Sequence, residues 1–275
     1  MKSIKPVATG TLTVYINAET RRAFKTLSLV LLFPVVLQAV QAAVYAPPTS
    51  GLVAWWRGED NADDSANGHN GSLFDGVGFS SGAFDRAFVF AGNANKVFVP
   101  DSPDFQLTQS LTIGAWVYPT ANSWTILQRG DSRAGTDPYT LTATTSGNWD
   151  FHITTSLGIT VGVSTPMTLG RWQQVTATLD GATGDMKLYI DGTLAAQRQT
   201  DLRPFADLTA SGAGIGIGNI PSGGEFPFIG KIDEVVLYSR AFTPQEVVLL
   251  VPEPSAVSLI ALGAGIVLYW RRRIV

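Results

Sequence analysis

Short segments rich in β-branched and aromatic residues recur along the middle of the chain, and turn-forming residues separate them. Strands at such spacing are typical of an antiparallel sandwich or barrel, and no rhythm of strands alternating with helices interrupts them. We therefore predict an all-β fold. The predicted strands are LVAWW (52–56), AFVF (87–90), KVFV (96–99), SLTIGAWVY (110–118), WTILQ (124–128), WDFHI (149–153), QQVTATL (173–179), MKLYI (186–190) and KIDEVVLY (231–238).

Two of these segments show the period-2 pattern of a strand with one buried face. In residues 111–118 the odd-numbered side chains are Leu, Ile, Ala and Val, and the even-numbered ones are Thr, Gly, Trp and Tyr. In residues 174–179 the odd-numbered side chains are Val, Ala and Leu, and the even-numbered ones are Gln, Thr and Thr. We expect the odd-numbered faces to form the core.

Local signals place the turns and one helix. The pair Asp191-Gly192 lies between two strand-like runs and is a strong signal for a two-residue β-hairpin. Thr243, Pro244 and Glu246 match the N-cap, N1 and N3 positions of a capping box, which predicts a short helix there. The glycine-rich stretch at 212–219 is not followed by a helix, so we interpret it as an inner strand and not as a dinucleotide loop.

The composition excludes several classes of function. The chain has 275 residues, a net charge of −3 and 15% charged residues, and its one dense basic cluster is close to the C-terminus. Nucleic acid as a partner requires clustered Lys and Arg on the folded body, so we expect none. The chain contains no cysteine, which excludes disulfides, thiol nucleophiles and thiolate metal sites.

The N-terminal end has the pattern of a signal peptide. Basic residues at 21, 22 and 25 precede the apolar run TLSLVLLFPVVLQAV, and small residues follow up to Ala42. We predict that residues 1–42 form a signal peptide with an extended basic leader, and that residues 43–50 form a linker. The apolar run is too short for a comfortable membrane span; a buried helix is the alternative.

The C-terminal end combines a Pro-Glu-Pro triplet, an uncharged apolar run at 256–270 and an arginine cluster. At 1.5 Å per residue the run is about 22 Å long, shorter than a bilayer core of about 30 Å. We nevertheless predict that the run is a short transmembrane helix that tethers the exported body, with the arginines after Trp270 on the cytoplasmic side. Residues 251–275 resemble the PEP-CTERM sorting signal of Gram-negative bacteria. The resemblance implies recognition by an exosortase at the inner membrane and export to the cell surface. It rests on Pro252, Glu253, Pro254, Arg271, Arg272 and Arg273.

Four landmarks of residues 51–250 resemble the LamG-like, concanavalin A-like domains of bacterial surface proteins. They are GLVAWWRGEDNADDSANGHNG, SLTIGAWVYP, GRWQQVTATLDGATGDMKLYIDGTL and GKIDEVVLYSRAFTPQEV. The resemblance implies a jelly-roll sandwich of two packed antiparallel sheets with about six or seven strands each. It specifies the function loosely, because this fold carries lectins, adhesive modules and glycosidases.

The loop DDSANGHNG at 63–71 concentrates oxygen donors and glycines, as a hard-cation site requires. A solvated loop of Asx turns is the alternative. The resemblance implies one structural Ca²⁺, bound by this loop and by the aspartate of the closing strand. The implied ligands are Asp63 or Asp64, Asn67, Asn70 and Asp233, with the choice between the first two left open.

The stretch RGDSRAGTDPY at 129–139 is a candidate carbohydrate surface, since aromatic faces stack on sugar rings and charged groups bind hydroxyls. The candidate residues are Trp124, Arg129, Asp131, Arg133, Tyr139 and Trp149. A polar loop beside a sheet is the alternative, and we interpret the RGD tripeptide as coincidental. Asp233 and Glu234 are adjacent, so alternation would place them on opposite faces and exclude the carboxylate pair of a retaining glycosidase.

Three functions remain open from the sequence. The first is an exported, non-catalytic module that binds polysaccharide or another matrix ligand. The second is a divergent glycoside hydrolase or polysaccharide lyase, which would require two carboxylates, or a Tyr/Arg pair, converging in a groove. The third is a structural envelope protein that makes protein–protein contacts.

Overall fold

The computed structural model describes residues 7–9, 12–14, 45–133, 135, 137–223 and 226–251. The chain divides into two compact units. One consists of Tyr45–Pro252, and the other consists of the two terminal segments, Met1–Val44 and Glu253–Val275. In the second unit, β1 (Val7–Thr9) and β2 (Leu12–Val14) form an antiparallel pair. The rest of the predicted signal peptide, and the sorting tail after residue 251, lie outside the described residues. Among the described residues, no helix has the length and apolar character needed to cross a membrane.

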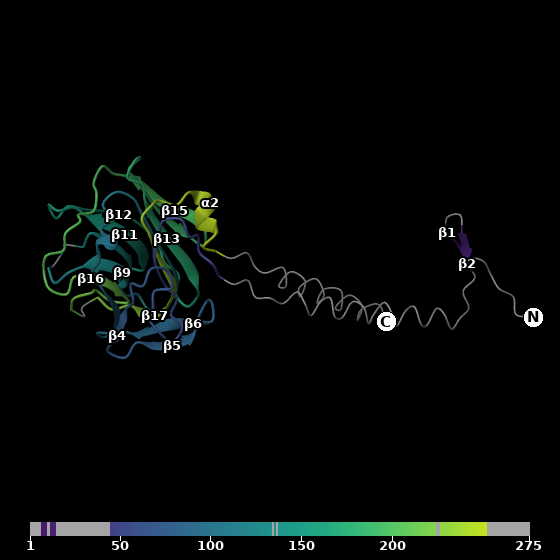
Figure 1. Ribbon diagram of the computed structural model, residues 1–275, viewed down its shortest axis with the longest axis horizontal. Helices are drawn as coiled ribbons and strands as arrows, with labels where there is room; N and C mark the ends of the chain where they lie inside the picture. Colours follow the sequence, from purple (N-terminus) through teal and green to yellow (C-terminus); the bar gives the residue numbers. More distant parts are fainter. Residues whose placement is uncertain are drawn as a thin grey trace, which may run out of the picture. The chain divides into compact units, whose positions relative to one another are not determined.

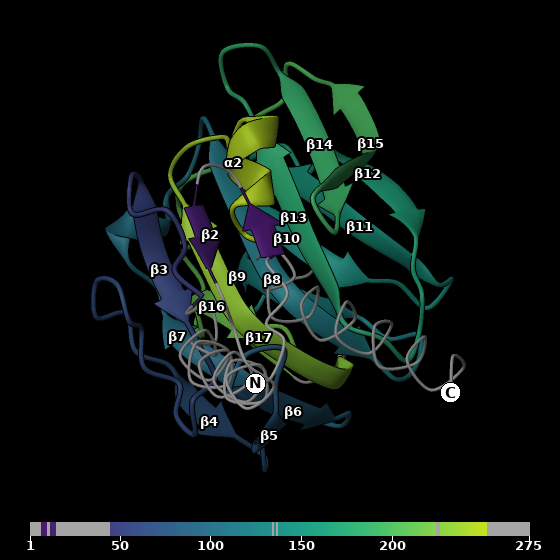
Figure 2. The ribbon, with the colours of Figure 1, turned by 90° about the vertical axis from the view of Figure 1, so that its right-hand side faces the viewer.

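The unit from Tyr45 is a sandwich of two antiparallel sheets (Figures 1 and 2), which confirms the all-β prediction. One sheet has seven strands and the other has eight. The first runs in the order β12 (Thr160–Pro166), β11 (Asn148–Thr154), β10 (Tyr139–Ala143), β9 (Thr125–Gly130), β16 (Gly214–Ile217), β7 (Lys96–Pro100) and β4 (Ser72–Phe74). The second runs β15 (Thr193–Gln199), β14 (Asp185–Ile190), β13 (Gln173–Leu179), β8 (Leu111–Pro119), β17 (Ile229–Tyr238), β6 (Arg86–Ala91) and β5 (Gly78–Ser81), and β3 (Leu52–Trp56) also pairs with β17.

Apolar side chains from the inner faces of both sheets form one continuous core. Ile113 and Ala177 come from the eight-stranded sheet, and Leu141, Phe151 and Ile215 come from the seven-stranded sheet; all five are fully buried. The odd-numbered residues of β8 and β13 lie in this core, as their alternation predicted.

The expectation of a single buried face is wrong for β8. A second apolar cluster covers its other side and includes Tyr45, Tyr238 and Leu250. Gly114 approaches Leu250, and the Trp116 indole Nε1 donates to the Leu250 carbonyl at 3.2 Å. Figure 2 shows α2 (Pro244–Val248) over this outer face of the sheet, so the segment after the last strand supplies a cover that strand alternation alone does not indicate.

The predicted turn and cap are confirmed. Asp191 and Gly192 both have positive φ, 50° and 77°, as a tight hairpin between β14 and β15 requires. Thr243 caps α2: its hydroxyl accepts from the Glu246 N–H, and the Glu246 side chain accepts in return from the Thr243 N–H.

A β-bulge in β17 corrects the interpretation of Asp233 and Glu234. Ile232 belongs to the inner core, and so does Val235, although strict alternation would place residues 232 and 235 on opposite faces. The register against β8 shifts between 233 and 236, and Glu234 has a φ of 51°. Asp233 contacts Phe84 and Glu234 contacts Trp55, which both pack on the outer cluster, so the two carboxylates lie on the same outer side.

The core between the two sheets predicts that truncation of Phe151 strongly lowers the stability of the fold. We expect Phe151→Ala to lower the free energy of unfolding by about 3–5 kcal/mol, because it leaves a cavity in a fully buried site. Leu157 follows the same strand and is 83% exposed, so Leu157→Ala is the matched control and should change stability by less than about 0.5 kcal/mol. Urea denaturation of the full chain measures both, and equal effects would contradict this packing.

Candidate functional site

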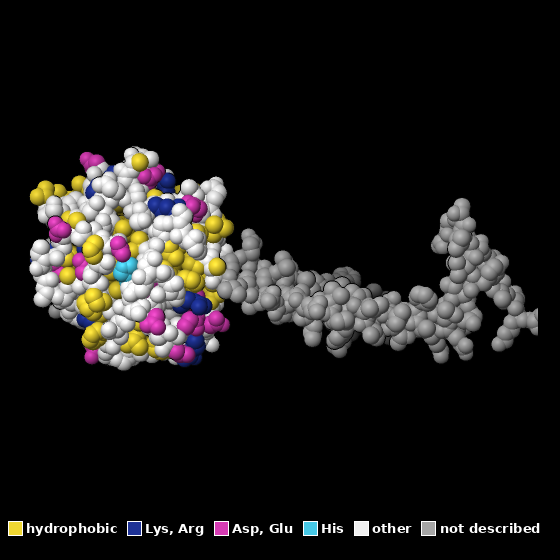
Figure 3. All heavy atoms as spheres, in the orientation of Figure 1, with side chains coloured by type: hydrophobic (Ala, Val, Ile, Leu, Met, Phe, Trp, Pro, Cys, Tyr) yellow, Lys and Arg dark blue, Asp and Glu magenta, His cyan; other side chains and the backbone are white. Residues whose placement is uncertain are grey.

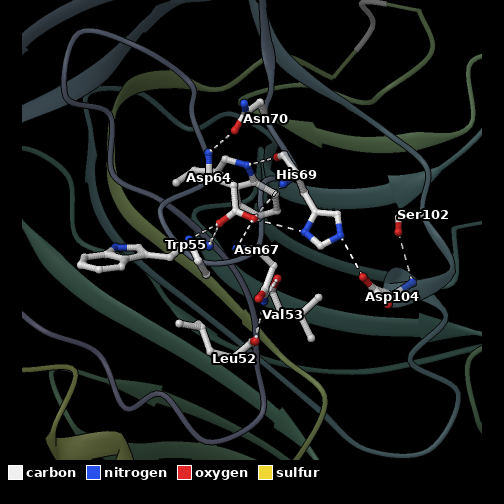
Figure 4. Close-up of polar contacts among 11 residues, drawn as sticks. Leu52, Val53, Trp55, Asp64, Asn67, His69, Asn70, Ser102 and Asp104 are labelled. Atoms are coloured by element: carbon white, nitrogen blue, oxygen red, sulfur yellow. Dashed lines mark hydrogen bonds and ion pairs between the residues drawn. The ribbon is translucent and has the colours of Figure 1, made fainter.

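The Asp64 carboxylate organises the loop that the sequence singled out (Figure 4). Its Oδ1 accepts from the N–H groups of Trp55 and Ala66 at 2.7 and 2.9 Å, and its Oδ2 accepts from those of Asn67 and His69 at 3.1 and 2.9 Å. Burial opposes ionisation, but the four backbone donors outweigh it and hold the pKa of Asp64 below its ordinary value.

The other donors of the loop are also engaged within the protein. The Asn67 amide donates to two carbonyls of β3, and the Asn70 side chain accepts from the Asp64 N–H at 2.9 Å. The His69 ring lies between the Asp64 carboxylate, at 3.2 Å, and the Asp104 carboxylate, at 3.0 Å. Asp63 is exposed. The loop therefore consists of Asx turns, as the alternative interpretation stated, but its central carboxylate is buried.

The loop is linked to the strand of Asp233 through β3. Asp64 bridges to Trp56 of β3, which in turn pairs with Val235 of β17, two residues from Asp233. The two carboxylates share no hydrogen-bond partner. Within the described parts of the chain, no three His, Cys, Asp or Glu side chains form a group that could hold a metal ion.

Asp233 instead meets backbone oxygens of the segment 82–86. It is fully buried, its Oδ2 accepts from the Phe84 N–H at 2.9 Å, and its Oδ1 has no hydrogen-bond partner. A Cβ at Gly82 would lie less than 3.0 Å from Asp233 Oδ2 and from the Phe84 and Arg86 carbonyl oxygens. These three oxygens therefore lie close together against the face of Gly82 that carries no side chain.

Negative charge around Asp233 is only partly balanced. Glu234 accepts from the Trp55 indole and lies 3.6 Å from Arg57, which is also 3.6 Å from Glu59. Burial raises the pKa of Asp233 to about 8 and that of Glu234 to about 7, and neighbouring carboxylates add to both shifts. Figure 3 shows acidic and basic side chains gathered over the nearby β5 and β6, where Arg86 pairs with Asp60 at 2.8 Å. Carboxylate and carbonyl oxygens with an unpartnered buried atom fit a hard cation such as Ca²⁺.

A separate groove of about 500 Å³ lies on the outer face of the seven-stranded sheet. Its floor is a polar row in which Gln128, Thr140 and His152 pair across β9, β10 and β11. The row ends in glycines, Gly216 on β16 and Gly162 on β12. The backbone of residues 219–221 packs directly over Gly216, and Trp124 and Phe226 form a wall in edge-to-face contact at 5.2 Å.

Two acidic residues line this groove, and their surroundings shift their pKa values in opposite directions. Asp131 is buried, but the Arg133 guanidinium and two backbone N–H groups bind its carboxylate and lower its pKa to about 2. Asp137 accepts from the Gln128 amide at 2.8 Å, and burial raises its pKa to about 6. A Cβ at Gly130 would lie 2.7 Å from an Asp137 oxygen, so the glycine lets this carboxyl group lie over the sheet.

Of the six predicted carbohydrate-binding residues, only Trp124, Asp131 and Arg133 line the groove. Arg129 and Tyr139 are fully buried: Arg129 forms two hydrogen bonds of 3.0 Å with Asp101, and the Tyr139 hydroxyl donates to the Phe105 carbonyl. Trp149 is fully buried in the core, and a buried Arg129 also excludes recognition of the RGD tripeptide on the folded surface.

The sequence reasoning missed Gln128, Thr140, His152, Asp137 and Phe226. The signal for the first three was present, since each alternates with core residues along its strand, as Thr140 does between Tyr139 and Leu141. Asp137 lies in the predicted stretch 129–139 but was not singled out, and no sequence pattern indicated Phe226, because different loops bring the two residues to the groove.

Comparisons with known proteins agree with this architecture. The model of the concanavalin A-like lectin/glucanases superfamily matches residues 91–248, and the PEP-CTERM protein-sorting motif matches residues 250–273. No curated protein matches the chain.

Solved structures show the same fold at low identity. The binding domain of Paraclostridial Mosquitocidal Protein 1 has a TM-score of 0.60 and 18% identity, over 74% of this chain and 52% of that one. The botulinum neurotoxin serotype D ligand-binding domain in complex with N-acetylneuraminic acid has a TM-score of 0.56 and 16% identity, over 74% and 51%. Domain 4 of AbnA, a GH43 extracellular arabinanase from Geobacillus stearothermophilus, in complex with arabinotriose, has a TM-score of 0.52 and 21% identity, over 73% and 98%. This chain thus spans about half the length of the toxin domains.

The loop geometry predicts a pH-dependent role for Asp64. We expect Asp64→Asn to destabilise the fold by about 2 kcal/mol at neutral pH, because it removes a charged acceptor of four N–H groups. The ionised carboxylate stabilises the fold above its unfolded pKa, and this contribution disappears as pH falls through the lower folded pKa. The difference from wild type should therefore shrink below about pH 4.

Denaturation of the full chain across pH measures this difference. Asp63→Asn, at the exposed neighbouring position, is the control and should behave as wild type. A pH-independent penalty at Asp64 would contradict a role for its charge.

Proposed function

Because the chain belongs to the concanavalin A-like lectin/glucanase superfamily, we propose that its sandwich is a non-catalytic module that binds polysaccharide in the groove over β9, β10 and β11. The observation that carries the proposal is the combination of an aromatic wall, Trp124 and Phe226, with a floor of hydrogen-bonding side chains. Sugar rings have apolar faces and hydroxyl edges, and a groove of this composition complements both. Bound carbohydrate in two structurally similar domains agrees with the idea.

The sorting motif supports the place of action. It indicates export by exosortase-type sorting in Gram-negative bacteria, so the ligand would be met at the cell surface or in the extracellular matrix. We propose further that the apolar segment after the Pro-Glu-Pro triplet holds the chain in the inner membrane until an exosortase processes it.

We also propose a structural Ca²⁺ at Asp233. The ligands would be the Asp233 carboxylate and the Phe84 and Arg86 carbonyls around Gly82, with Glu59 close by. When bound, the cation would link the central strand β17 to the segment between β5 and β6 and would balance the buried negative charge. Asp63, Asp64, Asn67 and Asn70 of the predicted ligand set would then shape the adjacent loop and not contact the metal.

A glycoside hydrolase is the second candidate, and one observation favours it. Asp131 and Asp137 line the same groove, and their environments move their pKa values apart, to about 2 and about 6, as in acid–base pairs. Against it, Arg133 and the Ala210 N–H hold the Asp131 carboxylate, which a nucleophile or base would need to have available. Release of reducing ends from polysaccharides by the purified chain would support the enzyme, and binding without release would support the module.

The proposed groove predicts that Trp124 contributes strongly to the affinity for a glycan. We expect Trp124→Ala to weaken binding of a recognised glycan about tenfold, roughly 1.4 kcal/mol, because one stacking face is lost. A glycan array followed by calorimetry measures it. Trp172 is half-buried against Tyr118 of β8, outside the groove, so Trp172→Ala is the matched control. No binding on a broad array, with self-association in light scattering, would instead favour a structural envelope protein.

The cation predicts a shift in thermal stability. Ca²⁺ at about 100 times its dissociation constant should add about 2.7 kcal/mol and raise Tm, and EDTA should reverse the rise. We expect Asp233→Asn to abolish the response, while Asp63→Asn should keep it, because Asp63 lies in the separate loop. A response that Asp63→Asn removes and Asp233→Asn keeps would place the site in the loop.

A further inference from the structure

A second cavity lies beside the groove, and we refer to the two together as the cleft. The second cavity has a volume of about 380 Å³ and is lined by Phe205, Asp207 and Thr155, and Arg133 lines both cavities. Trp124 precedes β9 and Arg133 follows it, so the six residues of that strand, about 20 Å in length, separate the ends of the first cavity. A single sugar ring fills only a small part of such a cleft.

Aromatic side chains stand at both ends of the cleft. Trp124 and Phe226 form the wall at one end, and Phe205 lies at the other, and each is partly exposed. The polar floor with Gln128 and Thr140 lies between them. Two separated stacking faces joined by a hydrogen-bonding floor suit a chain of sugars that passes through the cleft, and suit a single terminal sugar poorly.

The charges that line the cleft are predominantly negative. Among the described residues that line the two cavities, Arg133 is the one Lys or Arg side chain, and its guanidinium is bound to Asp131. Asp207 then remains without a basic partner among those residues, while His152, which also lines the groove, lowers the pKa of Asp137 and so partly offsets its burial. His152 is already paired with Asp150, at 2.7 Å. A carboxylate or sulfate on a ligand would meet a predominantly negative field in which Arg133 and His152 are already paired with carboxylates.

Burial at the floor of the cleft affects both a hydroxyl group and a carboxyl group. The Thr140 hydroxyl is buried and has no partner, and it lies next to Gln128, which donates to Asp137. Burial has already raised the pKa of Asp137 to about 6, so a donor from the ligand would stabilise its ionised form and a second anion would oppose it. A neutral hydroxyl group of the ligand therefore suits the Asp137 carboxyl group.

We propose that the cleft binds an internal stretch of a linear polysaccharide without carboxylate or sulfate groups, and that Asp137 is the residue that excludes anionic chains. This inference rests on the proposed carbohydrate-binding function and adds to it the charge class of the ligand and the mode of binding. Asp137 acts as a specificity-determining residue: it accepts from sugar hydroxyls and repels anionic substituents at the same position.

The test compares chains that differ in charge alone. A linear polyuronate and its carboxyl-reduced product, each prepared from disaccharide to hexasaccharide, are titrated into the full chain by calorimetry at neutral pH, beside glycans identified on the array. We expect the neutral chain to bind about tenfold more tightly than the uronate of equal length. We also expect affinity to increase with length well beyond the disaccharide. Higher salt should narrow the difference, because it screens the repulsion.

Asp137→Asn isolates the residue. The substitution keeps the shape of the side chain and its ability to form hydrogen bonds but removes its charge. The preference for the neutral chain over the uronate should therefore fall about fivefold. The control Asp63→Asn, at an exposed position outside the cleft, should leave this preference unchanged. Equal or tighter binding of uronates by the wild type, or no gain in affinity beyond the disaccharide, would overturn the inference while carbohydrate binding stood. If Asp137→Asn does not fold, the salt dependence of the wild type decides the charge effect. No binding of any glycan would overturn the proposed function and this inference with it.

Discussion

The sandwich depends on the pairing of one strand, β17, with three partners from distant parts of the chain. It pairs with β8 along one edge, and with β6 and then β3 along the other. The change from β6 to β3 occurs at Asp233 and Glu234, where the β-bulge and the positive φ of Glu234 lie. Asp233 lies on the outer side of the sheet by alternation with Ile232, and the bulge places Glu234 on the same side. The position that organises the sheet therefore also holds a buried carboxyl group whose pKa is raised to about 8, and a bound cation would favour its ionised form.

The strands were largely predictable from sequence because their signals are local. All nine predicted segments are strands, and the cap at Thr243 and the turn at Asp191-Gly192 follow from backbone chemistry that involves only neighbouring residues. The strands that were not predicted individually, such as β4 and β12, are short or polar and obtain their structure from pairing with a neighbour. The second cover of β8 was not predictable, because it depends on where the segment after β17 packs.

The candidate site was harder to predict, for a physical reason that Arg129 and Thr140 illustrate. Arg129 is charged and belongs to a polar stretch, yet its strand turns it inward to Asp101. Thr140 is unremarkable in composition, yet its strand turns it outward to the floor of the groove. Residue type alone suggested that Arg129 binds the ligand. The face of the sheet on which each side chain lies shows instead that Thr140 belongs to the groove and Arg129 does not. The same reason separates the Asp64 loop, whose donors satisfy one another, from Asp233, which has a free oxygen.

The central claim is that the outer face of the seven-stranded sheet is the carbohydrate-binding surface, and amide chemical shifts test it most directly. Isotope-labelled protein would be titrated with a neutral hexasaccharide that it binds. The account predicts that the largest shift changes occur at Gln128, Thr140 and His152 and at the flanking Trp124. Changes confined to the Asp64 loop or to the outer face of the eight-stranded sheet, with the groove amides unmoved, would contradict it.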